Sequence, residues 1–343
     1  MAELLERVEL SPTYVRTEMQ FRWPVFLSAL GGLFTANASD SRPKYELQAA
    51  ADFLFERRPF GSECADRTPG QRMEPGVRAV VSPQAAYKRT RPETLTLSRA
   101  DVPALTITAD PSNLVEVNGS NRGDWSLRYC AQAEGNSEGE ARQRLQEISM
   151  SRVGSAVSLR GPDLSQVAGT GGKLIVDAPV DAPIVVHASF AAVEVRDMTG
   201  PVRVTATHGR AKILDTTGKV DATGFVVDFA GSEGTVILSA EAEINLKLTA
   251  ARFDGTLSAW AQRFVRVLVP RAFQTPFQAS VNRPQDFVCR TDFCSKVKQE
   301  KKGGLYVFTY VGDGSKPPEQ VQLRSEQATV VIDTVGALSG AIQ

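Results

Sequence analysis

Short segments in which apolar and polar residues alternate recur along most of this chain. The segments Val193-Glu194-Val195-Arg196 and Val202-Arg203-Val204-Thr205 are apolar at every second position, and residues 264–269 continue the pattern. A period of two residues predicts β-strands with one buried face and one solvated face. The pattern therefore predicts an all-β protein built from many short strands.

A short template is repeated between these segments. It reads Asp-x-Thr-Gly-x-Val and occurs at residues 197–202 and again at 215–220. Looser copies that keep the glycine follow, and the four glycines are Gly200, Gly218, Gly234 and Gly255. Units this short cannot fold alone, but stacked units bury a continuous apolar core. We therefore expect a short, irregular β-solenoid.

The residues of the template predict turns between stacked strands. We expect the carboxylates of Asp197 and Asp215 to accept hydrogen bonds from backbone N–H groups just ahead of them, and the glycines to adopt positive φ. The structural turn residues are then Asp197, Gly200, Asp215, Gly218, Gly234 and Gly255. A partner would meet exposed residues between the corners, such as Arg196, Arg203 and Lys212.

One segment carries the signals of a helix. Ser137 and Glu140 form a capping-box pattern, and Ala141, Leu145 and Ile148 form an apolar stripe. The stripe predicts a helix over about residues 138–150 that closes one end of the stack, because repeat arrays need caps. Upstream of it, the Asn-Gly pair at 118–119 predicts a hairpin turn.

The chain divides by composition and pattern into five parts. They are a leader (1–38), a Pro- and Arg-rich segment expected to be poorly ordered (39–92), a β unit with the capping helix (93–152), the β-solenoid repeat domain (153–335) and a tail (336–343).

The leader has the features of a signal peptide. Residues 24–36, PVFLSALGGLFTA, are uncharged and too short to span a bilayer, and Ala36-Asn37-Ala38 supplies a small-x-small cleavage pattern. Translation from Met19 would give this leader a positive start at Arg22. We expect export to the periplasm, cell surface or extracellular space, with no transmembrane helix in the mature chain. The alternative is a buried core helix or strand of a cytoplasmic protein.

Export affects how the four cysteines are interpreted. An even number of cysteines in an oxidising compartment favours disulfides, and four cysteines allow three pairings. Cys289 and Cys294 are near neighbours suited to a local staple, which leaves Cys64 with Cys130. Neither histidine nor CxxC spacing accompanies them, so no metal site is predicted.

Composition and spacing argue against several kinds of chemistry. Lys+Arg and Asp+Glu are 39 each, so there is no basic excess for nucleic acid. The two histidines, His187 and His208, lack the spacing of a catalytic set. The segment 169–173 resembles a phosphate loop but lacks the first glycine and the Ser/Thr of that motif. We predict no catalytic residue, no cofactor and no enzymatic activity.

From Leu95 to about Asp333 the chain resembles the bacterial putative-adhesin family, a domain of unknown function built of glycine-punctuated strands. The motifs are the strand and turn at 114–119, the helix EGEARQRLQEIS, residues 182–186, and VEVRDMTGPVRVTATHGRAKILDTTGKVDATG. The chain departs from the family at Phe190-Ala191-Ala192, where a glycine is expected, and in its cysteine-bearing N-terminal segment. The resemblance implies an exported, non-enzymatic β-solenoid at the cell envelope. We expect an adhesin or scaffold that presents one face of the solenoid to a protein or glycan partner.

Two other functions are compatible with the sequence. A carbohydrate-active enzyme, a polysaccharide lyase or hydrolase, could use paired acids on a β-helix, with candidates at Asp177, Asp181, Asp197 and Asp215. A sensor or scaffold subunit of an envelope stress system would instead be held by a membrane partner.

Overall fold

The computed structural model describes residue 64 and residues 87–161, 170–312, 320–327 and 329–335. These residues belong to one compact unit, Phe55–Gln343. The predicted signal peptide, its cleavage site and the tail lie outside the described residues, so those predictions remain expectations.

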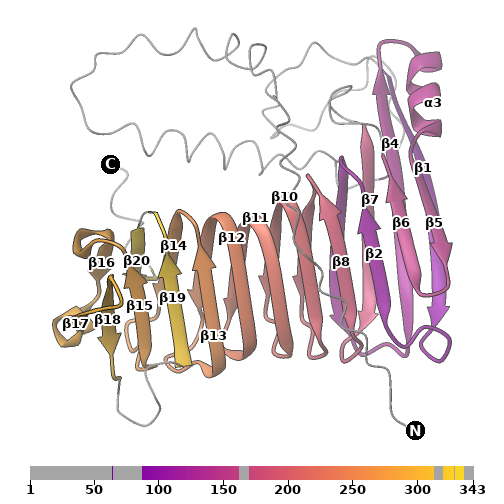
Figure 1. Cartoon of the computed structure of the whole chain (residues 1–343). Helices are drawn as coiled ribbons and strands as arrows, with labels where there is room; N and C mark the ends of the chain where they lie inside the picture. Colours follow the sequence, from indigo (N-terminus) through magenta and orange to yellow (C-terminus); the bar gives the residue numbers. More distant parts are fainter. Residues whose placement is uncertain (1–63, 65–86, 162–169, 313–319, 328, 336–343) are drawn as a thin grey trace, which may run out of the picture. The chain divides into compact units, whose positions relative to one another are not determined.

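The twenty strands of this part form one hydrogen-bonded sheet that is folded into two ladders (Figure 1). In spatial order the first ladder contains β5 (Ser149–Val153), β6 (Ala156–Arg160), β2 (Leu105–Ala109), β8 (Ile184–Ser189), β10 (Val202–Leu214), β11 (Lys219–Gly231), β12 (Glu233–Leu248), β13 (Asp254–Ala261), β19 (Val321–Ser325), β15 (Phe277–Val281), β18 (Leu305–Tyr310) and β17 (Lys298–Lys302). The second contains β1 (Tyr87–Ser98), β4 (Asp124–Gly135), β7 (Gly171–Pro179), β3 (Asn113–Ser120), β9 (Ala192–Arg196), the second halves of β10, β11 and β12, β14 (Phe264–Val269), β20 (Thr329–Thr334) and β16 (Phe287–Arg290). The long strands β10, β11 and β12 bend between the ladders and belong to both.

Parallel pairing winds the chain into coils, each with one segment in either ladder. Val202 pairs with Ile184 on one side and with Val220 on the other. In the second ladder Ile213 pairs with Val195 and Phe229. The all-β class predicted from the alternation is confirmed. The parallel stacking of like residues fits the predicted β-solenoid.

The interior between the ladders is filled by the inward positions of the alternating segments. Val204 of the first ladder and Ile213 of the second are 1% and 0% exposed, and both belong to one apolar core. Burying a side chain of this size stabilises the fold by about 1.5–3 kcal/mol. Since each coil contributes only a few such residues, the core becomes continuous only when coils are stacked.

The order of the coils in space differs from their order in the sequence at both ends. The coil of β2 and β3 lies between that of β6 and β7 and that of β8 and β9. The last coil, β19 and β20, lies between β13/β14 and β15/β16. The β unit predicted at 93–152 is therefore part of the stack rather than a unit beside it.

Antiparallel strands and one helix close the two ends. At one end β1 and β4 continue the second ladder, β5 continues the first, and α3 (Glu138–Gln146) packs against β4 and β1 (Figure 1). At the other end lie β18, β17 and the 3-10 helices η1 (Pro284–Asp286) and η2 (Asp292–Lys296). The outermost strand β17 reads KQEKK and is exposed throughout, and such charge discourages pairing with a further chain.

The helix α3 fulfils the prediction of a cap, with shorter bounds. Ser137 Oγ accepts from the backbone N–H of Glu140 at 3.2 Å, while Glu140 Oε2 accepts from that of Asn136 at 2.7 Å. Ala141 is buried in the helix, whereas Ile148 is buried beyond its end. The prediction that it runs to residue 150 is wrong, because β5 begins at Ser149.

Two further expectations fail for reasons of long-range pairing. The strand β1 begins at Tyr87, inside the segment expected to be poorly ordered, because residues 87–92 pair with β4. The Asn118-Gly119 pair makes no hairpin turn, because β3 continues to Ser120 and pairs with β7 and β9. A Cβ on Gly119 would lie 2.0 Å from the carbonyl oxygen of Asp197, so close backbone approach explains this glycine.

One corner of the stack is built from the repeated template. Asp197 and Asp215 themselves adopt positive φ, 57° and 47°, and their backbone N–H groups donate to Leu214 and Ala230 of the following coils. The glycines of the template allow the backbones of successive coils to approach one another closely. A Cβ on Gly218 would lie 2.4 Å from the carbonyl oxygens of Gly200 and Thr199. Gly234 and Gly255 combine such proximity with φ of 121° and 118°. The expected positive φ is thus found at the aspartates of the first two copies and at the glycines of the looser copies.

Gly218→Ala should therefore destabilise the stack by about 1–3 kcal/mol, as overpacking does. Gly123→Ala is a control outside the helices and strands, since nothing lies within 4 Å of its added Cβ, and should change stability by less than about 0.5 kcal/mol. Urea unfolding followed by circular dichroism measures both. Equal midpoints for the two variants would contradict the corner contact.

Candidate functional site

Two central rows of outward positions in the first ladder contain few charges, and we call these two rows the hydroxyl face. Its two rows follow the register from β2 to β19 across neighbouring coils. They are Thr106, Val185, Arg203, Asp221, Ile237, Ser258 and Gln322, and Thr108, His187, Thr205, Thr223, Ser239, Trp260 and Arg324. Six of these fourteen residues are threonine or serine and three carry a charge, and Ile237 is an exposed apolar residue among them, at 48%.

The outward positions of the second ladder form a contrasting surface, the charged face. Its residues with charged or amide side chains from β7 to β14 are Lys173, Asp177, Glu116, Asn118, Glu194, Arg196, Arg210, Lys212, Asp228, Glu243, Asn245, Lys247 and Arg266. The two faces lie on opposite sides of the same apolar core, so the fold presents two chemically different surfaces.

Charges on the charged face pair with one another across neighbouring coils. Lys212 Nζ lies 3.2 Å from Glu194 Oε2, and Arg210 pairs with Asp228. Asp228 also accepts a hydrogen bond from Asn245 at 3.0 Å. Partly exposed pairs of this kind contribute about 1 kcal/mol or less each. They align neighbouring coils, and they leave this face with much of its charge already compensated.

Glu116 shows the electrostatic effect of this pairing. Burial acts to raise its pKa, but the hydrogen bond and charge of Lys173, 2.9 Å away, outweigh burial and hold the pKa below the usual value. A lowered carboxyl pKa contributes stability above the unfolded pKa, which is lost as the pH falls through the folded pKa. The pair therefore stabilises the stack at neutral pH.

The three cations expected to meet a partner each have an intramolecular carboxylate. Arg196 and Lys212 both pair with Glu194, and Arg203 lies 3.2 Å from Asp221 on the hydroxyl face. Lys212 and Arg203 remain part-exposed in these pairs. Their engagement favours a role in coil alignment over one as free contact points for a partner.

Two of the four acids considered for catalysis, Asp177 and Asp181, pair with arginine. Asp177 lies 3.2 Å from Arg128, and Asp181 accepts two hydrogen bonds of 2.8 Å from Arg99, which lowers the pKa of that carboxyl. Asp197 and Asp215 serve as corner residues, and within the described ranges no backbone N–H bonds their carboxylates. Nor do three or more His, Cys, Asp or Glu side chains there form a group suited to a metal ion.

The two histidines lie in different settings. His187 is exposed on the hydroxyl face. His208 adopts a positive φ of 54° at the other corner, stacks on Phe190 with ring centroids 4.9 Å apart, and has Nδ1 3.4 Å from Glu241 Oε2. His187 lies between Thr108 and Thr205 in its row, and among the described residues no hydrogen bond joins its ring to either hydroxyl.

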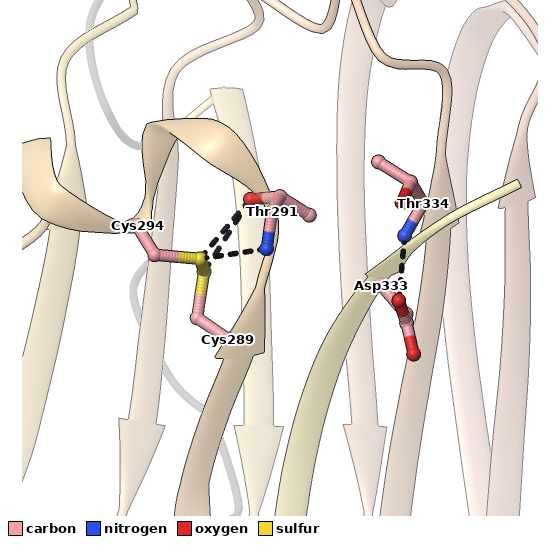
Figure 2. The surroundings of a disulfide bond; sticks show 5 residues. All are labelled: Cys289, Thr291, Cys294, Asp333 and Thr334. Atoms are coloured by element: carbon pink, nitrogen blue, oxygen red, sulfur yellow. Dashed lines mark hydrogen bonds between the residues drawn. A yellow bond between two sulfur atoms is a disulfide. The ribbon is translucent and has the colours of Figure 1, made fainter. Parts of the chain in front are cut away.

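The structure contains both disulfides favoured by the cysteine spacing, Cys64–Cys130 and Cys289–Cys294. Figure 2 shows the second, which joins β16 to η2. The backbone N–H of Thr291 donates to Cys294 Sγ at 3.0 Å, and its hydroxyl lies 3.1 Å from the same sulfur. Beside it, the N–H of Thr334 donates to the Asp333 carboxylate at 2.9 Å. The Cys289–Cys294 disulfide therefore forms a local cross-link within the outer coil.

The sequence patterns described above did not identify Ile237 or Trp260 as candidate residues. Both fall on the outward parity of their strands, between buried Val236 and Leu238 and between buried Ala259 and Ala261. The signal that could have identified them in the sequence is a large apolar residue at a position where the alternation predicts an exposed side chain.

Within the described residues, no helix is long and apolar enough to cross a membrane.

Comparisons with known proteins give a limited result. No protein-family model matches the chain. No curated protein matches it either.

Solved structures of low similarity do match. A putative cell adhesion protein from Clostridium sporogenes is 8% identical, with 72% of this chain and 99% of that chain covered and a TM-score of 0.29. A putative adhesin from Bacteroides fragilis is 9% identical, with coverage of 71% and 97% and a TM-score of 0.27. One from Parabacteroides merdae is 8% identical, with coverage of 71% and 96% and a TM-score of 0.27.

The two disulfides should differ in their effect on stability. Cys64 and Cys130 are 66 residues apart and Cys289 and Cys294 only 5. Loop-closure entropy predicts a loss of about 4 kcal/mol for Cys64→Ser with Cys130→Ser and about 2 kcal/mol for Cys289→Ser with Cys294→Ser. Denaturant unfolding of both double variants, with the oxidised parent as reference, measures the difference. The opposite ranking would show that the long loop is constrained by other contacts.

Proposed function

We propose that this protein is a non-enzymatic binding scaffold of the bacterial cell envelope, which docks an extended partner on its hydroxyl face. The observation that carries the proposal is the asymmetry of the two faces. The charged face compensates much of its charge internally, whereas the hydroxyl face presents exposed hydroxyl and apolar groups with only three charged residues among them.

The hydroxyl face has the composition of a surface that can be desolvated on binding. Displacing water from a surface with few charges costs less than stripping ionised groups. The exposed hydroxyls of Thr108 and Thr223 can donate and accept hydrogen bonds, and Ile237 offers apolar area. Parallel strands repeat every 4.7–4.9 Å or so, which gives a regular surface for an elongated partner.

The cell envelope is proposed as the location on two grounds. Disulfides persist in oxidising compartments, and two are present. The uncharged segment 24–36 followed by Ala36-Asn37-Ala38 has the pattern of a signal peptide. The pairing of Asp177 with Arg128 and of Asp181 with Arg99 supports a structural role for these two acids, against a polysaccharide-cleaving enzyme.

The location has a direct test. Fractionation of the native cells should place the protein in the periplasm, at the surface or in the medium, and sequencing of its N-terminus should start at Ser39. An uncleaved chain in the cytoplasm would refute export.

The docking face can be tested with two variants of one strand. Ile237 and Lys247 both lie on β12, the first exposed on the hydroxyl face and the second on the charged face. Immobilised envelope material from the native organism should retain the parent and Lys247→Glu equally. Ile237→Arg should lower retention at least about tenfold, since it places an unpaired charge in the interface.

Either of two outcomes would refute this function. Retention unchanged by Ile237→Arg would exclude the hydroxyl face. Release of soluble sugar from an acidic polysaccharide, abolished by Asp215→Asn, would establish an enzyme.

A further inference from the structure

Trp260 is a large aromatic side chain on the outward side of the hydroxyl face. It lies on β13, between Ser239 of β12 and Arg324 of β19 in the same row. Its indole is partly exposed, whereas Trp125 is fully buried. In the part of the chain that the structure describes, the Trp260 Nε1–H has no hydrogen-bond partner. A tryptophan left in this position offers both a flat apolar surface and a free donor.

The groups around Trp260 are polar and exposed but uncharged, with one exception. Ser258 lies two residues before it on the same side of β13, and Gln322 pairs with Ser258 across the ladder. Both side chains are exposed. On the other side, Ile237 pairs with Ser258 and extends the apolar surface diagonally. The site therefore combines a ring, an aliphatic neighbour and a border of hydroxyl and amide groups.

The charges near the site are compensated within the chain. Arg324 Nη2 lies 3.6 Å from Glu326 Oε1. The other two charged residues in the two rows of the hydroxyl face, Arg203 and Asp221, pair with each other at 3.2 Å. A ligand recognised here gains little from a net charge of its own. This argues against an anionic or cationic polymer and for a neutral one.

A neutral sugar matches these features by its chemistry. One side of a pyranose ring presents C–H groups that stack on an aromatic ring, while its hydroxyls bond to serine, glutamine and guanidinium groups at the edge. Neighbouring strands are about 4.8 Å apart. That spacing is close to the length of one pyranose unit, so an extended chain of sugars along the stack would meet one coil per unit.

We infer that Trp260, bordered by Ser258, Gln322 and Arg324, is the stacking platform of a subsite for a neutral, extended polysaccharide. This inference rests on the proposed function, because it names the partner of the hydroxyl face. The polysaccharide lies across the strands, with one pyranose over the Trp260 ring and the following units over Ser239 and Thr223 of the same row.

The test uses the full chain and two soluble probes, a neutral β-linked glucan and a neutral α-linked mannan, in affinity electrophoresis. At least one probe should retard the parent, equally at low and high salt. Trp260→Ala should weaken binding about tenfold or more, as loss of aromatic stacking does for bases, and Trp260→Phe by less than about threefold. Phe264→Ala is the matched control, because Phe264 follows on β14 of the same coil but lies outward on the charged face.

The outcomes separate this inference from the proposed function. If neither probe binds, or if Trp260→Ala binds like the parent, the subsite is refuted. Retention by envelope material that still depends on Ile237 would then leave the hydroxyl face as a docking surface for a protein. Loss of both activities would refute both proposals. Trp260→Phe, which keeps the core and the ring, shows whether weak binding by Trp260→Ala reflects misfolding.

Discussion

Close contact between the backbones of successive coils is the constraint on which the rest of this structure depends. At the corner of the template, a Cβ on Gly218 would lie within 2.4 Å of the coil before it. The backbone N–H of Thr217 reaches the carbonyl of Met198 at 2.9 Å in the same region. Parallel strands hydrogen-bond at a fixed spacing, and their corners must follow at that spacing too. Side chains are therefore excluded from the inside of the corner.

This constraint also sets the two surfaces. Once the coils are in register, every outward side chain stands directly beside its counterparts above and below. Like charges in such a row would repel, as they do across paired strands. Glu194, Lys212 and Asp228 follow one another in one row and satisfy this requirement by alternating sign. Threonine and serine on the hydroxyl face satisfy it by carrying no charge. One face thus contributes to holding the coils in line, and the other carries few charges that need such pairing.

Local pattern predicted much of this fold, and long-range pairing determined the rest. Alternation located the strands around Val204 and Val267, and the spacing of Gly200 and Gly218 predicted stacking. The hairpin predicted at Asn118-Gly119 was wrong. The Asn-Gly signal is local, whereas the extended conformation of β3 is fixed by its pairing with β7 and β9. The positive φ of Asp197 could not be read from composition, since glycine is the usual residue for it. The platform at Trp260 depends on neighbours more than sixty residues away in the sequence, such as Arg324.

The interleaved order of the coils at the C-terminal end has a consequence for how the chain is made. The strands β19 and β20 fill a place between coils synthesised earlier, so this end of the stack stays open until residues 321–334 leave the ribosome. Pairing of such distant segments is also intrinsically slow, because the loop between them must close first. The last strands to be synthesised therefore complete the core between coils that are already present.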